Sequence, residues 1–249
     1  YYTAFASGKF TPNTTILDTP VSYRDGNGWY YPRNYDNTFM GAIPIRTALA
    51  QSRNVPAVKI GKAVGMNKVI ETCRTLGIMS PMEPVSSLPL GAIGVTPLEM
   101  ASAYATFANY GWRSPPTIIA RVTDGSGNVL IDNTPKPQRV LDPWASAAIL
   151  DVMQTVVKEG TGRGADIGRP VAGKTGTTSS EKDIWFIGTV PQLTTAIWVG
   201  RDNNRQLSSH ATGGGMVAPI WRDFMQKALK DVPVEKFQPP SNFPRPKSN

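Results

Sequence analysis

A lysine and several threonines stand close together in the segment Gly173 to Thr178, which reads Gly-Lys-Thr-Gly-Thr-Thr. On a strand, the ammonium group of Lys174 and the hydroxyls of Thr175 and Thr177 can point into a groove and bind a carboxylate. Gly176 lets a substrate backbone approach the strand, because glycine has no Cβ. Lys-Thr-Gly alone also occurs by chance where a strand enters a turn. The segment therefore needs a partner elsewhere in the chain.

The same lysine fits a second pattern. From Gly168 the chain reads Gly-Arg-Pro-Val-Ala-Gly-Lys-Thr, which is the spacing of a phosphate-binding P-loop. A P-loop needs an apolar strand before its first glycine and a helix directly after its lysine. Residues 160–166 are too polar and glycine-rich for that strand, and residues 176–180 are poor helix formers. A P-loop nucleotide-binding protein is thus a minor alternative.

A second short polar motif, Ser52-Arg53-Asn54, lies about 120 residues before the Lys-Thr-Gly segment, at the junction of two expected helices. Ser52 and Asn54 could protrude there into a cleft. The same residue types would also serve as an ordinary helix cap. The motif therefore gains meaning only together with Lys174.

The remaining composition excludes several kinds of site. Cys73 is the only cysteine and His210 the only histidine, so an internal disulfide, a zinc cluster and a His-pair metal site are excluded. We interpret His210 as a solvated loop residue and not as part of a triad. Lys and Arg outnumber Asp and Glu by 26 to 18, but the basic residues are scattered and do not alternate with aromatic residues. We expect no metal, no cofactor and no nucleic-acid partner.

Helix signals surround both motifs. Residues 1–6 predict the end of a helix with Gly8 as its C-terminal cap, and residues 11–41 predict loops with short extended pieces. A helix opening at Asp142-Pro143 has an apolar stripe from Ile149 to Val157 and stops at Gly160. Further helices are expected at 43–51, at 55–64, at 67–76 with Asn67 as cap, at 97–109 with a capping box at Thr96 to Glu99, and from Pro219, with Ile220, Phe224, Met225 and Ala228 on one face.

Strand signals are concentrated later in the chain. A hairpin is expected at 117–123 and 128–131, and three antiparallel strands at 171–177, 184–190 and 195–199. Strands grouped late, with helices before and after, predict an α+β fold with an antiparallel sheet flanked by helices. Residues 1–230 are expected to belong to this domain. Residues 231–249 carry five prolines and are predicted to be a Pro-rich tail or linker.

Ser-x-Asn followed by Lys-Thr-Gly is the motif pairing of the penicillin-recognising serine enzymes. The chain also resembles the transpeptidase domain of class A penicillin-binding proteins in longer stretches, which follow the same order over residues 1–230. These stretches are Ala48–Val58, Leu90–Ala92, Val95–Met100, Ala103–Asn109, Ala172–Thr178, Asp183–Gly188, Trp198–Gly200 and Ala218–Trp221. The resemblance implies the fold shared by these transpeptidases and the serine β-lactamases.

The resemblance also implies an activity. In this family a serine attacks the D-Ala-D-Ala amide of a peptidoglycan stem peptide, and the acyl group then passes to an amine of a second stem peptide. Ser52 would relay a proton to the leaving amine, and Asn54 would orient the family's motif lysine and the substrate amide. Lys174 would sustain the electric field around Ser52. Thr175 and Thr177 would hold the terminal carboxylate, and the Thr177 N–H would supply half of an oxyanion hole.

One departure from the family concerns its Ser-x-x-Lys motif, which supplies the acylated serine and a lysine on a helix. No such motif lies at its place in this sequence; it is expected just before Tyr1, and Tyr1 to Gly8 resembles the remainder of that helix. We therefore expect the sequence to be part of a longer domain. By itself it should be neither acylated by penicillin nor active in transpeptidation.

Two alternatives stay open beside the transpeptidase. A non-catalytic peptidoglycan-binding or β-lactam sensor module would keep the groove without the serine, and a serine β-lactamase would share the fold. The expected partners of the transpeptidase are stem peptides, β-lactams and an associated N-terminal fragment. The resemblance implies an upstream membrane anchor and glycosyltransferase domain, and a location on the outer face of the bacterial cytoplasmic membrane. No run of about eighteen apolar residues occurs in the sequence itself.

Overall fold

The β-branched and aromatic runs late in the chain form a three-stranded antiparallel sheet, as predicted. The computed structural model describes residues 1–248. The strands β9 (Ala172–Thr177), β10 (Asp183–Val190) and β11 (Leu193–Gly200) lie in the order β11-β10-β9. Lys174 on β9 lies opposite Ile187 on β10. Within the described residues β9 pairs only with β10, so its outer edge is free of any other strand.

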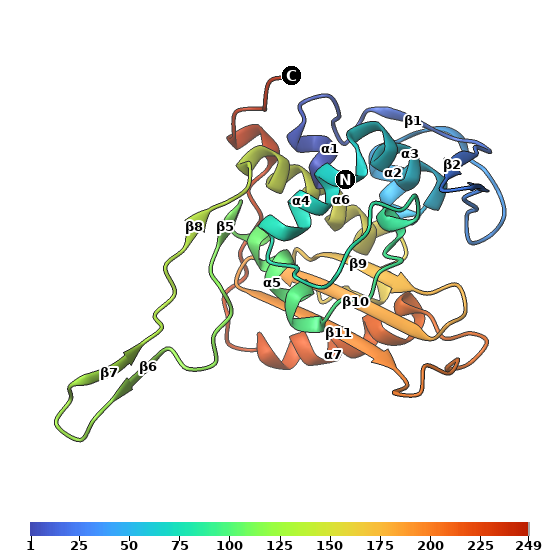
Figure 1. Cartoon of the computed structure of the whole chain (residues 1–249). Coiled ribbons are helices and arrows are strands. Elements are labelled where there is room, and N and C mark those ends of the chain that lie inside the picture. The colour runs from blue at the N-terminus through green and yellow to red at the C-terminus, as the bar shows by residue number, and fades with distance from the viewer. Residues whose placement is uncertain (249) are drawn as a thin grey trace.

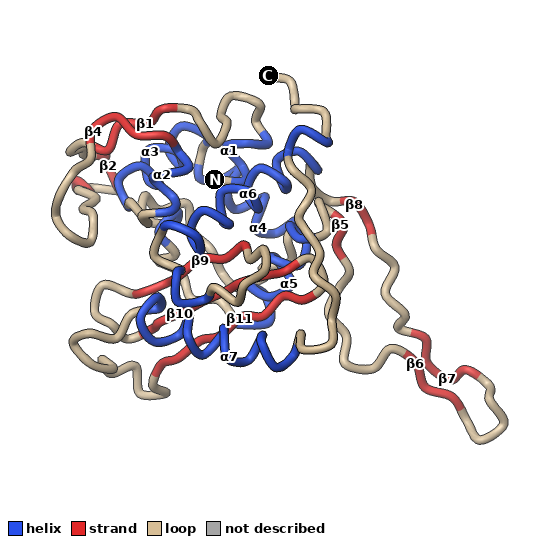
Figure 2. Tube along the Cα trace, turned by 180° about the vertical axis from the view of Figure 1, so that it is seen from behind, coloured by secondary structure: helices blue, strands red, loops and turns tan. Residues whose placement is uncertain are grey.

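Helices complete the predicted α+β fold. The α-helices are α1 (Tyr2–Ala6), α2 (Ile45–Ala50), α3 (Asn54–Val64), α4 (Met66–Thr75), α5 (Pro97–Ala108), α6 (Pro143–Glu159) and α7 (Ala218–Ala228). Shorter turns of helix are η1 (Leu88–Leu90), η2 (Arg163–Ala165), the π-helical η3 (Gly213–Val217) and η4 (Pro240–Asn242). The two views show α5 on one face of the sheet and α7 on the opposite face (Figures 1 and 2). Helix α6 contacts both β9 and α2, and so it joins the sheet to the helical layer.

The helix termini follow the sequence signals with two exceptions. The helix expected at 43–51 begins at Ile45, because Ile43 and Pro44 belong to strand β4 (Gly41–Pro44). Thr96 and Glu99 form the predicted capping box of α5, and Asp142 caps α6 by accepting a hydrogen bond from the Ala145 N–H. Asn67 is not the cap of α4. Gly65, with φ of +91°, occupies that position and lets the chain turn directly from α3 into α4, which places Asn67 inside the helix.

The buried side of α7 differs from the stripe seen in the sequence. Of the predicted apolar face only Met225 is buried, whereas Ile220 is 49% and Phe224 50% exposed. The helix instead packs Trp221 on the sheet, where its ring meets Phe186 edge to face at 5.2 Å and its Nε1–H donates to the Thr195 carbonyl at 3.0 Å. Burying the large indole with its N–H satisfied outweighs the alternative face.

The segment before α2 contains pairings that the sequence did not reveal. Strand β1 (Thr15–Asp18) pairs antiparallel with β4 (Gly41–Pro44), and β2 (Tyr23–Asp25) pairs with β3 (Gly28–Tyr30). The β1–β4 pairing matters for the site, because it leads β1 to end at Asp18 close to the junction of α2 and α3.

A long hairpin arm projects from the body of the molecule (Figures 1 and 2). At its root β5 (Trp112–Arg113) pairs with β8 (Gln138–Arg139), and at its tip β6 (Arg121–Thr123) pairs with β7 (Val129–Asp132). The Asp124 side chain closes the tip by accepting from the N–H groups of Ser126 and Asn128. The predicted hairpin is therefore confirmed.

The segment after Asp231, expected as a Pro-rich tail or linker, packs on the body in residues 231–248. Phe237 is buried, and Phe243 stacks on Tyr110 with ring centroids 5.2 Å apart. Arg245 donates a hydrogen bond to the Gly8 carbonyl at 2.7 Å. The two phenylalanines supply apolar contact that the proline content does not suggest. No helix in residues 1–248 is long and apolar enough to cross a membrane.

Candidate active site

The two predicted motifs meet in space. The Nζ of Lys174, on β9, donates a hydrogen bond to the Oγ of Ser52 at 2.8 Å. The same ammonium group donates to the Thr175 carbonyl at 3.0 Å and lies 3.3 Å from the Thr175 Oγ1. The sheet and the helical layer are thus joined at a cluster of an ammonium group and hydroxyls, the groups from which acyl-transfer sites are built.

Ser52 occupies an unusual backbone position. The Ser52 N–H donates to the Leu49 carbonyl and the Arg53 N–H to the Ala48 carbonyl, which are the two bonds of a Schellman motif at the end of α2. Ser52 has φ of +53°, in the left-handed region where glycine normally stands. A side chain there costs about 1 kcal/mol. The strained conformation of Ser52 directs its hydroxyl toward Lys174.

This strain leads to a prediction for Ser52→Gly. Relief of the left-handed strain and the greater backbone freedom of unfolded glycine nearly cancel, so the free energy of unfolding should change by less than about 1 kcal/mol. In a polypeptide that joins this chain to its Ser-x-x-Lys segment, reactivity with penicillin should fall sharply, because the hydroxyl is lost. Chemical denaturation and acylation rates measure the two effects. An unchanged acylation rate in a folded Ser52→Gly protein would show that Ser52 has no role in the site.

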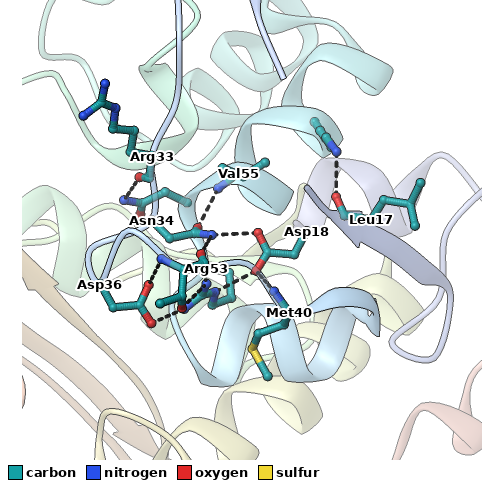
Figure 3. A network of polar contacts seen from close by, with 11 residues as sticks. Leu17, Asp18, Arg33, Asn34, Asp36, Met40, Arg53 and Val55 are labelled. Carbon is teal, nitrogen blue, oxygen red and sulfur yellow. Dashed lines mark hydrogen bonds and ion pairs between the residues drawn. The ribbon is translucent and has the colours of Figure 1, made fainter. Parts of the chain in front are cut away.

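Arg53, the middle residue of the motif, anchors the junction of α2 and α3 in the interior (Figure 3). It is only 7% exposed, and its Nε pairs with the fully buried Asp18 at 2.8 Å. One terminal nitrogen pairs with Asp36 at 2.8 Å, and the other donates to the Thr38 carbonyl. The Arg53 hydrogen bond also holds the pKa of Asp36 well below its usual range. The guanidinium thereby ties β1 and the loop before β4 to the Ser-x-Asn motif.

Asn34 extends this network to the start of α3 (Figure 3). Its Nδ2 donates to Asp18 at 2.7 Å, and its Oδ1 accepts from the Val55 N–H at 3.1 Å, one of the free donors at a helix N-terminus. Asn54 donates through Nδ2 to the Arg33 carbonyl at 2.9 Å. The amide of Asn54 is thereby oriented, and its Oδ1 makes no hydrogen bond within residues 1–248.

The predicted substrate-binding residues lie along the edge strand β9. Thr175 Oγ1 is 2.7 Å from Thr161 Oγ1, and Thr177 Oγ1 accepts from the Gly213 N–H at 3.0 Å. Alternation along a strand places Thr175 and Thr177 on the same side. Two adjacent hydroxyls beside an ammonium group suit a carboxylate, and the free strand edge can pair with an extended peptide.

The structure gives a reason for glycine at position 176 that the sequence did not show. A Cβ on Gly176 would lie 3.0 Å from the Trp185 Cβ, and a Cβ on Gly213 would lie 2.5 Å from the Gly176 carbonyl oxygen. The glycines of η3 therefore lie against β9 at Gly176. The run Gly213-Gly214-Gly215 is the signal that could have identified this close backbone contact in the sequence.

The electrostatics of the site are dominated by Lys174. Its desolvation by burial lowers the pKa of Lys174 from 10.5 to about 8. None of the ion pairs within residues 1–248 involves Lys174. A half-buried ammonium group without a carboxylate partner creates a positive field, which an anionic substrate would complete.

Other candidates from the sequence lie outside this site. The P-loop alternative is wrong, because the chain continues after Lys174 as strand β9 and no helix begins there. His210 is exposed, and no cluster of three potential metal ligands exists among the described residues. The sequence contains one literal Ser-x-x-Lys spacing, Ser179 to Lys182, but it lies in the turn between β9 and β10.

Comparisons with known proteins show which family and which folds the chain resembles. The family model described as penicillin binding protein transpeptidase domain matches residues 1–226. Penicillin-binding protein 1A of Aquifex aeolicus is 38% identical over 98% of the chain. The crystal structure of penicillin-binding protein 1A from Haemophilus influenzae, 29% identical, matches 96% of the chain with a TM-score of 0.88.

A second similar structure is that of the PonA1 protein from Mycobacterium tuberculosis in complex with penicillin V. It is 25% identical, and it matches 95% of this chain and 70% of its own with a TM-score of 0.83. The chain spans about a third of the length of the Aquifex relative (34%) and 42% of the Haemophilus chain. The similarity thus covers nearly all of this chain and one part of these longer proteins.

Proposed function

Because the chain belongs to the penicillin-binding protein transpeptidase family, we propose that it forms the substrate groove of a serine D,D-transpeptidase that cross-links peptidoglycan stem peptides. The observation that carries the proposal is the 2.8 Å contact between Lys174 and Ser52 beside the hydroxyls of β9. A D-Ala-D-Ala end has a peptide backbone and a terminal carboxylate. The free edge of strand β9 can pair with the peptide backbone. Lys174 and its neighbouring threonines offer cationic and hydroxyl donors for the terminal carboxylate.

Each residue of the cluster has a role in this proposal. Thr175 and Thr177 hold the carboxylate, and the Thr177 N–H stabilises the oxyanion that forms on the scissile carbonyl. The positive Lys174 lowers the energy of the anionic intermediate, and it fixes the Ser52 hydroxyl in position. Ser52 passes a proton to the leaving amine, and Asn54 orients the substrate amide.

The acylated serine is proposed to lie on a Ser-x-x-Lys helix outside these 249 residues. The one such spacing in the sequence lies in the β9–β10 turn, away from a helix. The alternative is a Ser–Lys dyad formed by Ser52 and Lys174. Assigning Ser52 to proton relay follows the family motif, in which Ser-x-Asn is separate from the nucleophile.

The wider setting is proposed on the same basis. β-Lactams should acylate the complete protein, as a penicillin V complex of the similar PonA1 protein suggests. The relatives are longer than this chain, and we propose an upstream part that contains a glycosyltransferase domain and a membrane anchor. The site would then work on the outer face of the cytoplasmic membrane, where stem peptides are joined.

The test is the rate of acylation by benzylpenicillin as a function of pH, in a polypeptide that joins this chain to the Ser-x-x-Lys segment. Intact mass should rise by one penicillin. The second-order rate should fall about tenfold per pH unit above pH 8, because Lys174 loses its charge there. A Lys174→Arg variant stays charged and should lose this falling limb, whatever its absolute rate.

Two results would contradict the proposal. A wild-type protein with an intact fold and no penicillin adduct would favour the non-catalytic peptidoglycan-binding or sensor module. A falling limb that survives in Lys174→Arg would show that another group titrates, and Lys174 would lose its electrostatic role.

A further inference from the structure

We infer that Thr161, in the loop after α6, is a positioning residue for recognition of the substrate carboxylate, acting through Thr175. This inference rests on the proposed function and names a residue that neither sequence motif contains. Thr161 is exposed, and its Oγ1 lies 2.7 Å from the Thr175 Oγ1 on β9. It therefore stands beside the two hydroxyls of the predicted carboxylate site.

The backbone of Thr161 is fixed by the parts of the fold that carry the site. Its N–H donates to the Ala50 carbonyl, at the last residue of α2, at 3.1 Å. A Cβ on Gly160 would lie 2.1 Å from the same Ala50 oxygen, and a Cβ on Gly214 would lie 2.4 Å from the Thr161 carbonyl oxygen. The close contacts around Thr161 hold it between the Ser-x-Asn junction and the glycines of η3.

The hydrogen bonds of Thr175 explain what Thr161 contributes. A hydroxyl has one hydrogen to donate and two lone pairs that accept. The Lys174 ammonium, 3.3 Å away, occupies one lone pair of the Thr175 oxygen. The hydrogen between the Thr161 and Thr175 oxygens can belong to either residue. A bound carboxylate accepts the single hydrogen of Thr175, so the Thr161 hydroxyl then donates to the other lone pair. Thr161 thus supports Thr175 as a donor to an anion.

The expected ligand group is the carboxylate that D-Ala-D-Ala ends and penicillins share. A carboxylate only accepts hydrogen bonds, so it gains from a hydroxyl whose hydrogen has no other acceptor. An ester of the same ligand is neutral and a weaker acceptor, and it should depend less on this orientation. The ratio of the acylation rates by acid and ester therefore reports the effect of Thr161.

The experiment compares benzylpenicillin with its methyl ester on the complete protein carrying Thr161→Val, which keeps the shape and removes the hydroxyl. The acid-to-ester rate ratio should fall about fivefold, and Thr161→Ser should restore most of it. Thr194→Val is the matched control, because Thr194 forms an equivalent 2.7 Å hydroxyl pair with Thr189 at the far end of the sheet. The control should leave the ratio unchanged.

The ratio is taken within one protein sample, so partial unfolding of a variant lowers both rates and leaves the ratio intact. A wild-type-like rate ratio in Thr161→Val would overturn the inference, and so would an equal loss of the ratio in Thr161→Ser. The proposed function would still hold in both cases, provided that the wild-type protein is labelled by penicillin. A wild-type protein that takes no penicillin would overturn the proposed function, and this inference with it.

Discussion

A Lys174→Met variant is expected to be acylated by benzylpenicillin at least about a hundredfold more slowly than the wild-type protein, in line with the loss of one well-placed electrostatic group in an active site. The variant loses the positive field, the hydrogen bond to Ser52 and the donor to the Thr175 hydroxyl. It should also gain stability near pH 7, because a desolvated charge is removed. Single-turnover labelling and thermal unfolding measure the two effects.

Lys182→Met is the control for this variant. Lys182 stands in the turn after β9, where its backbone N–H donates to Thr178 and its side chain makes no hydrogen bond within residues 1–248. Its replacement removes the same formal charge from the protein and should leave the acylation rate within about twofold, as expected for a solvent-screened charge. Equal losses in the two variants would mean that net charge, and not the position of Lys174, controls the reaction.

Arg53→Met is expected to lower the free energy of unfolding by about 3–5 kcal/mol, because Asp18 keeps a buried carboxylate that has lost its cation. Asp18 is fully buried, and only the Asn34 side chain and the Met40 N–H remain as its donors. Acylation by the folded fraction should fall as well, since Arg53 holds the junction that presents Ser52. Denaturation monitored by circular dichroism measures the first effect.

Arg46→Met provides the matched comparison. Arg46 pairs with Asp151 at 2.6 Å, but both side chains are about a third exposed. Such a pair should contribute less than about 1 kcal/mol. Replacing Asp18 as well, by Asn in an Arg53→Met background, should cost less than the sum of the single changes, because no buried unpaired charge remains. Similar losses in the Arg46 and Arg53 variants would contradict the anchoring role of the buried network.

The main helices, the three-stranded sheet and both motifs follow from local sequence signals, whereas the β1–β4 and β2–β3 pairings do not. The capping box at Thr96 and the β-branched and aromatic run of β10 act over a few residues, and each agrees with the fold. The face of α7 does not follow, since two apolar stripes compete on that helix. Only the sheet beneath it selects Trp221 over Phe224. Tertiary packing determines which face of such a helix is buried, and the periodicity of its sequence does not show that face.

The site divides in the same way. Ser52 and Lys174 could be predicted as site residues because their two motifs are specific as a pair. Their 2.8 Å contact nevertheless joins elements that are distant in the sequence. The role of Asp18 could not be predicted, because it depends on the pairing of β1 with β4. Thr161 stands between glycines that indicate flexibility in sequence. In the structure Gly160 permits a backbone contact with Ala50 that is too close for a Cβ.

The most direct test of the account is to locate the penicillin adduct by peptide mapping, after benzylpenicillin has reacted with the polypeptide that joins this chain to its Ser-x-x-Lys segment. We predict a single modified serine, in that segment and outside residues 1–249, with Ser52 unmodified. An adduct on Ser52 would instead identify a Ser52–Lys174 dyad as the catalytic centre and would contradict the proton-relay role assigned to Ser52.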